Sequence, residues 1–222
     1  FFIAAPIFLS AQNAANPERN DTTQASNYIL LDIADQITED DYNKLLDSLK
    51  RYHTTDYLEL RMAHTKTDSY DPYSTEASIM FNKANALLAK GKYEKGLAII
   101  EDILDNNYVN LKAHLWASLI YYELQDSVKG QYHKNIYDGL FESIILNGDG
   151  RGTKTAYIVI DINEEFDILE AYNLENASQN SIESDGHSFD RIEVNEKDKK
   201  EVINIYFNID LPIAYLEKRR TD

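Results

Sequence analysis

The sequence predicts an α+β fold in which a layer of helical hairpins is followed by a small, mostly antiparallel β-sheet with a short helix. In the front part of the chain apolar residues recur every three or four positions, whereas in the back part they mostly alternate with polar ones. The period changes at residues 147–153, Asn-Gly-Asp-Gly-Arg-Gly-Thr, which hold three of the eight glycines. Because glycine has the freest backbone, we place the hinge between the two parts in this glycine loop.

The first clear helix of the front part begins after Thr38. Thr38 and Asp41 have the spacing of a capping box, in which two side chains satisfy the first free N–H groups of a helix. Residues 53–74 are less regular, and further helices are expected from Ser74 or Thr75 to Gly91, at 93–106, at 111–124 and at 128–146. The first helix carries one apolar face at helical spacing, made of Tyr42, Leu45, Leu46, Leu49 and Tyr52.

The helices before and after Gly91 together have the dimensions of one tetratricopeptide repeat. Gly96 replaces the usual alanine of that motif, however, and any antiparallel pair of helices that cross at small residues gives a similar pattern. We therefore predict tetratricopeptide-like hairpins and leave open whether they bind peptides. The positions that fit the motif are Ala84, Leu87, Gly91, Tyr93, Gly96 and Ile103.

The back part reads as strands around one short helix. Alternation predicts strands at 155–162, 191–194 and 202–209, with turns at Asp185-Gly186 and at 195–198. Asn163 is expected to cap a helix over Glu164–Tyr172, and we expect the adjacent carboxylates of Glu164 and Glu165 to be solvated acids of its first turn. Three or four mostly antiparallel strands and a helix complete an α+β fold.

The N-terminal residues favour export. Residues 1–12 are apolar and end in small and polar residues, as the hydrophobic core of a signal peptide does, and they are too few to cross a bilayer. We therefore interpret 1–12 as a truncated signal peptide and expect a periplasmic or secreted protein. Residues 13–27 form a polar, flexible leader, 28–147 the helical part and 148–222 the β-rich part. We expect 28–222 to form one conjoined domain.

Several short motifs resemble those of one protein family. The motifs are Tyr70-Asp71-Pro72-Tyr73, Gly148-Asp149-Gly150, residues 155–160, 164–166 and 190–194, and Ile205-Tyr206-Phe207-Asn208-Ile209. Together they resemble an uncharacterised family of secreted proteins found mainly in Bacteroidota, known as domain of unknown function 4919. Asn208 stands where the family pattern has Asp. The resemblance implies export and a single conjoined domain, and it implies no activity.

Composition excludes several classes of function. The formal net charge of −16 argues against binding a nucleic acid, because phosphate contacts need clustered Lys and Arg. The absence of Cys excludes disulfides, thiol nucleophiles and Cys-ligated metals. The five histidines lack the spacing of a metal motif, so we expect neither a metal nor a cofactor. No segment of the mature chain is long and apolar enough to span a membrane.

The glycine loop invites two further interpretations that its sequence does not support. A phosphate-binding P-loop follows a strand and opens a helix, whereas this loop follows a helix and precedes a strand. An EF-hand loop counted from Asn147 would place Arg151 and Ile158 at two positions that need oxygen ligands. We therefore expect the loop to end a helix and lead into a strand.

Two groups of residues are candidates for function. His133 stands on the last helix before the glycine loop, where Asp149 and Arg151 could steer it as a general base, although no nucleophile motif accompanies them. Tyr70 and Tyr73 flank a turn, and amphipathic rings of this kind suit recognition of protein. They would also suit carbohydrate if both rings were exposed and roughly coplanar.

The sequence thus favours a non-enzymatic module that binds a protein or ligand through its helical layer. Its partner would be another envelope protein or a polypeptide segment. The alternative is a hydrolase-type enzyme whose site, with His133, Asp149 and Arg151, lies at the junction of the helices and the sheet. These two hypotheses make different demands on the structure, because the first needs an apolar or Tyr-lined surface and the second a histidine within reach of a carboxylate.

Overall fold

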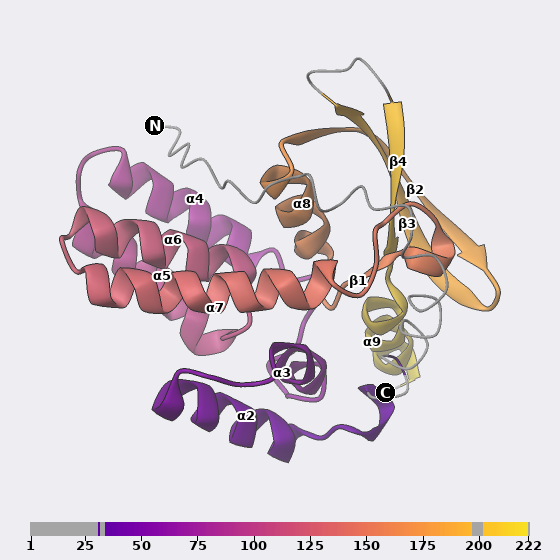
Figure 1. Ribbon diagram of the computed structural model, residues 1–222, viewed down its shortest axis with the longest axis horizontal. Coiled ribbons are helices and arrows are strands. Elements are labelled where there is room, and N and C mark those ends of the chain that lie inside the picture. Colours follow the sequence, from indigo (N-terminus) through magenta and orange to yellow (C-terminus); the bar gives the residue numbers. More distant parts are fainter. Residues whose placement is uncertain (1–30, 32–33, 197–201, 222) are drawn as a thin grey trace. The chain divides into compact units, whose positions relative to one another are not determined.

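The computed structural model describes residues 31, 34–196 and 202–221 of the chain (Figure 1). The predicted signal remnant at 1–12 and the predicted leader at 13–27 lie outside the described residues, as does most of the turn expected at 195–198. From residue 37 on, the chain divides into two compact units, which are Ile37–Glu142 and Ser143–Asp222. None of the helices within the described ranges has the length and apolar character that crossing a membrane requires.

The first unit is helical, as the sequence predicts. Its capping box forms, because the Thr38 hydroxyl accepts a bond from the Asp41 N–H at 3.4 Å and an Asp41 carboxylate oxygen accepts one from the Thr38 N–H at 3.1 Å. The helices are α2 (Glu39–Tyr52), α3 (Tyr57–His64), α4 (Glu76–Leu88), α5 (Tyr93–Asn106), α6 (Leu111–Glu123) and α7 (Ser127–Ile145), of which α7 continues past the unit boundary.

Helix α3 lies in the segment that the sequence left irregular. Asp56 caps it by accepting a hydrogen bond from the Glu59 N–H at 2.9 Å. Leu60, Met62 and Ala63 are fully buried. Its eight residues are too few to show a clear apolar period, so α3 depends on burial against the rest of its unit rather than on a local signal.

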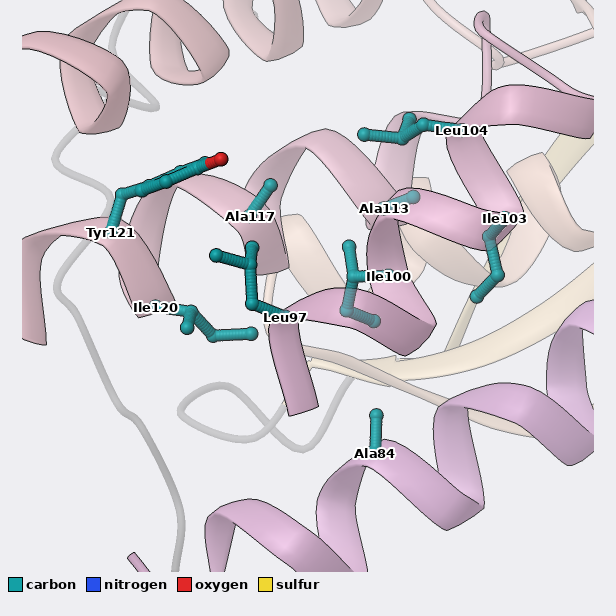
Figure 2. Close-up of a cluster of buried hydrophobic side chains, with 9 residues drawn as sticks. All are labelled: Ala84, Leu97, Ile100, Ile103, Leu104, Ala113, Ala117, Ile120 and Tyr121. Atoms are coloured by element: carbon teal, nitrogen blue, oxygen red, sulfur yellow. The ribbon is translucent and has the colours of Figure 1, made fainter. Parts of the chain in front are cut away.

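The core of the helical unit lies between α4, α5 and α6. Figure 2 shows Ala84 of α4 directed towards Ile100 and Leu97 of α5, with the apolar side chains of α6 behind them. A Cβ atom added at Gly96 would stand 2.6 Å from a methyl carbon of Leu88. Small side chains at Ala84 and Gly96 therefore allow α4 and α5 to approach closely, as the hairpin prediction requires.

The second unit contains a four-stranded sheet with the strand order β1-β4-β3-β2 (Figure 1). The β2–β3 and β3–β4 pairs are antiparallel and the β1–β4 pair is parallel, which confirms the mostly antiparallel prediction. The elements are the short 3-10 helix η2 (Thr153–Thr155), β1 (Tyr157–Ile158), α8 (Ile162–Ala171), β2 (Leu174–Ser184), β3 (His187–Glu196), β4 (Val202–Asn208) and α9 (Asp210–Thr221).

Three details of the β-rich prediction are wrong. The strand expected at 155–162 is only the two-residue β1, because Asp161 caps α8 by accepting from the Asn163 N–H at 2.8 Å. Strand β2 was not predicted, since it is an outer strand with mostly exposed polar side chains and no alternation. Helix α9 was not predicted either, although Pro212, its third residue, is compatible with the first turn of a helix.

The predicted Asp185-Gly186 turn sets the register of the sheet. Both residues have positive φ, 53° and 83°, as a two-residue hairpin turn of type I′ requires. The register that follows places Ser181 opposite Asp190 and Gln179 opposite Ile192. Because side chains alternate between the faces of a strand, these four residues share one face of the sheet.

Candidate functional site

Helix α6 carries two stripes of apolar side chains, one fully buried and one half-buried. On the side towards the core of its unit, Ala113, Ala117 and Ile120 are fully buried. A second stripe carries Lys112, Leu115, Trp116 and Leu119 at positions i, i+3, i+4 and i+7, and all four are only half-buried. Trp116 also packs against the core of the unit, and part of the second stripe stays exposed to solvent.

A ring from α4 extends the second stripe of α6. The Phe81 and Trp116 rings meet edge to face, with centroids 5.2 Å apart. The Lys112 ammonium lies 6.0 Å from the Phe81 centroid, at the outer limit of a cation–π contact. We call Phe81, Lys112, Leu115, Trp116 and Leu119 the α4–α6 surface. Two aromatic rings, two aliphatic side chains and one cation suit an apolar ligand that also carries a negative group.

The tyrosines singled out in the sequence lie in the helical unit in different environments. Tyr70 is only 7% exposed, and its ring stands edge-on to His64 with centroids 5.7 Å apart. Tyr73 is half-buried, and its N–H donates to the Asp71 carboxylate at 3.2 Å. The exposed, coplanar pair that carbohydrate binding requires is therefore not formed. Tyr70 contributes to packing around a buried histidine.

His133 belongs to a buried network of aromatic rings in the helical unit. Its Nδ1 atom lies 3.0 Å from Nδ1 of His114, and Nε2 of His114 lies 2.9 Å from the Tyr108 carbonyl oxygen. Because a carbonyl oxygen only accepts, we assign the His114 hydrogen to Nε2. His114 Nδ1 is then the acceptor and His133 Nδ1 the donor. The Tyr121 ring stacks on His133 with centroids 5.5 Å apart.

The buried histidines of this unit are neutral at pH 7. Burial, followed by the nearby His133, lowers the pKa of His114 to about 3. Burial likewise lowers the pKa of His133 to about 4, with Lys129 as the second cause, and it lowers the pKa of His64 to about 4. His133 is thus held in a hydrogen-bonded pair with another imidazole.

The glycine loop holds Asp149 and Arg151 together by a local hydrogen bond. The Asp149 carboxylate accepts from the Arg151 N–H at 3.0 Å and from the Thr155 hydroxyl at 2.5 Å. The N–H groups of Asp149 and Gly150 both donate to the Thr155 carbonyl, at 3.0 and 2.8 Å. Asp149 therefore closes its own loop, in the second unit, while His133 lies in the first.

A histidine and a carboxylate do meet, at a pair that the sequence did not indicate. His187 Nδ1 lies 2.6 Å from Asp210 Oδ2, and the two side chains are 25% and 23% exposed. The Ser188 N–H donates to Asp210 Oδ1 at 2.7 Å and the Asn208 amide to Oδ2 at 2.9 Å. Since the carboxylate accepts all three bonds, it orients the His187 ring with a hydrogen on Nδ1.

The His187–Asp210 pair joins the start of β3 to the start of α9. The residues are separated by 23 positions, and only the hairpin turn at 185–186 together with the return of β4 brings them together. Within residues 31, 34–196 and 202–221, no three His, Asp or Glu side chains are grouped so that they could hold a metal ion. The hydrogen-bonded pair is a candidate for acid–base chemistry.

Comparison with known proteins gives one match. A family model described as Domain of unknown function (DUF4919) matches residues 27–218, which include all the elements named above except the last residues of α9. The search of curated proteins found no match, and neither did the search of solved structures.

Proposed function

The chain belongs to the DUF4919 family, and we propose that it is an exported, non-enzymatic module that binds a polypeptide segment through its helical layer. The observation that carries this proposal is the second apolar stripe of α6, because Leu115, Trp116 and Leu119 are only half-buried and lie beside the residues that α6 buries in its core. The apolar residues 1–12 support export.

The α4–α6 surface has the features that recognise an apolar side chain next to a carboxylate. Phe81 and Trp116 offer rigid ring surfaces, which bind at a low cost in conformational entropy. Lys112 supplies a cation beside them, in a chain whose net charge is −16. The close crossing of α4 and α5 at Ala84 and Gly96 gives the surface a rigid support, in the manner of a tetratricopeptide-like hairpin.

Peptides selected from a random display library on the full chain test this proposal. We expect them to carry an aromatic or aliphatic residue near an acidic one. We also expect them to change the fluorescence of Trp116, which is the single tryptophan of the chain. Leu115→Asp should weaken their binding at least about tenfold, since it places a charge in the apolar stripe. Dissociation constants from fluorescence titration measure the effect.

Val128→Asp is the matched control, because Val128 lies on α7 and is 80% exposed. It introduces the same charge outside the α4–α6 surface and should leave the dissociation constant unchanged. Circular dichroism of both variants checks that each is folded. Equal weakening by the two variants, or selected peptides that leave Trp116 fluorescence unchanged, would refute binding at this surface.

The His187–Asp210 pair favours a second candidate function, hydrolysis by an activated water. Nε2 of His187 would accept a proton from water as the water attacks an ester carbonyl, while Asp210 stabilises the imidazolium that forms. As the C–O bond to the leaving group breaks, the imidazolium would return this proton, so that a carboxylic acid and an alcohol are released. If the purified chain hydrolyses p-nitrophenyl acetate, His187→Ala should reduce kcat/KM by about 100-fold. His53→Asn is the control, because His53 is exposed and its left-handed φ of 59° suits Asn. Equal rates for the two variants would exclude His187 as the base.

A further inference from the structure

Two carboxyl groups of the second unit lie close together between α8 and the sheet. Glu165 of α8 is fully buried and Asp190 of β3 is 6% exposed. One amide bridges them, since Nε2 of Gln179 donates to Glu165 Oε2 at 3.1 Å and to Asp190 Oδ2 at 2.8 Å. Ser181 donates its hydroxyl to the other Asp190 oxygen at 2.5 Å. The two carboxyl groups therefore belong to one hydrogen-bonded cluster.

The burial of these acids corrects the expectation that Glu164 and Glu165 are solvated. Glu164 is 5% exposed, and its Oε2 accepts the Ile160 N–H at 2.8 Å. The side chain of Glu165 is covered because α8 packs on the face of the sheet that presents Gln179, Ser181 and Asp190. An acidic pair in the first turn of a helix is usually exposed, and here the packing of α8 overrides that tendency.

The carboxyl groups of this cluster cannot all be ionised at the same time. The charged groups that act on Glu165 are Asp190 of β3, together with Asp161 and Glu164 at the start of α8, and all of them are acidic. The residues that β2 presents are the neutral Gln179 and Ser181. Arg191 follows Asp190 on β3, so alternation turns its side chain to the other face of the sheet. Two buried carboxylates in contact cannot both stay ionised without a cation.

One oxygen atom of the cluster indicates which of the two carboxyl groups is protonated. Glu165 Oε1 is buried and has no hydrogen-bond partner among the residues that the structure describes. A bare carboxylate oxygen in that position would be an uncompensated buried charge, whereas a protonated carboxyl group is neutral. Asp190, by contrast, has donors on both oxygens.

We infer that Glu165 and Asp190 form a proton-binding site that holds one proton on Glu165 at neutral pH and fastens α8 to the sheet. Burial, followed by the negative charge of Asp190, raises the pKa of Glu165 from its ordinary value of 4.5 to about 9. The folded unit therefore binds one proton more than the unfolded chain between these two pH values. The stability that this proton supplies is complete in acid and is lost as the pH rises through this window.

Urea unfolding followed by the methyl NMR signals of Ile192 and Val194 on β3 tests this inference in the full chain. As the pH rises from 6 to 8, the stability that the Glu165 proton supplies should decrease, so that the unfolding constant of this unit rises about 100-fold, which is tenfold for each pH unit. Glu165→Gln carries a neutral amide of the same shape and should remove that rise. Glu164→Gln is the control and should keep it, since an amide oxygen can still accept the Ile160 N–H.

A direct titration needs no variant. The carboxyl carbon of Glu165, labelled with ¹³C, should show its chemical-shift change above pH 7 in the folded chain. A change centred near pH 4.5, or the same pH dependence of unfolding in Glu165→Gln and the wild-type chain, would overturn the inference.

Discussion

Acidification from pH 7.5 to pH 4.5 is expected to destabilise the helical unit by several kcal/mol, because this unit buries three neutral histidines. His64, His114 and His133 are 2%, 0% and 9% exposed. Burial is the largest cause of the lowered pKa of each, to about 4, about 3 and about 4. In the unfolded chain the same imidazoles titrate near their ordinary pKa of 6.5.

The difference in proton binding between the folded and unfolded chain explains why acid destabilises the helical unit. Between these lowered pKa values and 6.5 the unfolded chain binds protons that the folded unit does not bind, so falling pH favours unfolding. Stability is complete above 6.5 and decreases as the pH falls. At pH 4.5 each histidine contributes a loss of about 2.5 kcal/mol. Three such losses approach the whole stability of a typical domain, which is about 5–15 kcal/mol.

Trp116 fluorescence measures this transition, because the single tryptophan lies on α6 of the helical unit. His64→Phe should move the acid midpoint to lower pH, since Phe fills the space between Tyr42 and Tyr70 and does not titrate. His53→Asn should leave the midpoint unchanged, because the His53 side chain is exposed. A chain that stays folded at pH 4, or equal midpoints for His64→Phe and wild type, would contradict this account.

Gly148→Ala is expected to destabilise the second unit by about 2–4 kcal/mol. A Cβ atom at this position would lie 2.4 Å from the Thr155 carbonyl oxygen and 2.8 Å from that of Ala156. Both are backbone atoms, and Thr155 O also accepts the N–H groups of Asp149 and Gly150. The clash therefore cannot be relieved by rotating a side chain. It displaces the segment that leads into β1.

Gly152→Ala is the control within the same loop. No atom lies within 4 Å of a Cβ added there, and its φ of −168° is extended backbone that any residue adopts. The substitution should change the free energy of unfolding by less than about 0.5 kcal/mol, or stabilise slightly by restricting the unfolded chain. Urea unfolding of both variants measures these free energies. Similar free energies for the two would show that loop flexibility, rather than close packing at Gly148, sets the effect.

The local signals in the sequence predicted most of the helical unit and the main lines of the sheet. The Thr38–Asp41 capping box and the Asp185-Gly186 turn both form, because each depends on residues within a few positions of one another. The helix at 93–106 has its predicted bounds, since its apolar face is strongly periodic. The helical front and mostly antiparallel back follow from the change of period at the glycine loop.

The pairs that make up the candidate sites depend on contacts between distant residues, which the sequence does not reveal. His187 meets Asp210, and Glu165 meets Gln179 and Asp190, only after the hairpin and the packing of α8 are in place. The mostly polar β2 becomes a strand for the same reason, because its partner β3 supplies the hydrogen bonds that its own side chains do not predict.

By itself, the sequence determined the fold class, the first cap and the hairpin turn, since these depend on periodicity and on neighbouring residues. Only the tertiary structure decided which side chains are buried together. Burial lowers the pKa values of His114 and His133 and raises that of Glu165, because the loss of water around a side chain depends on every element that packs against it.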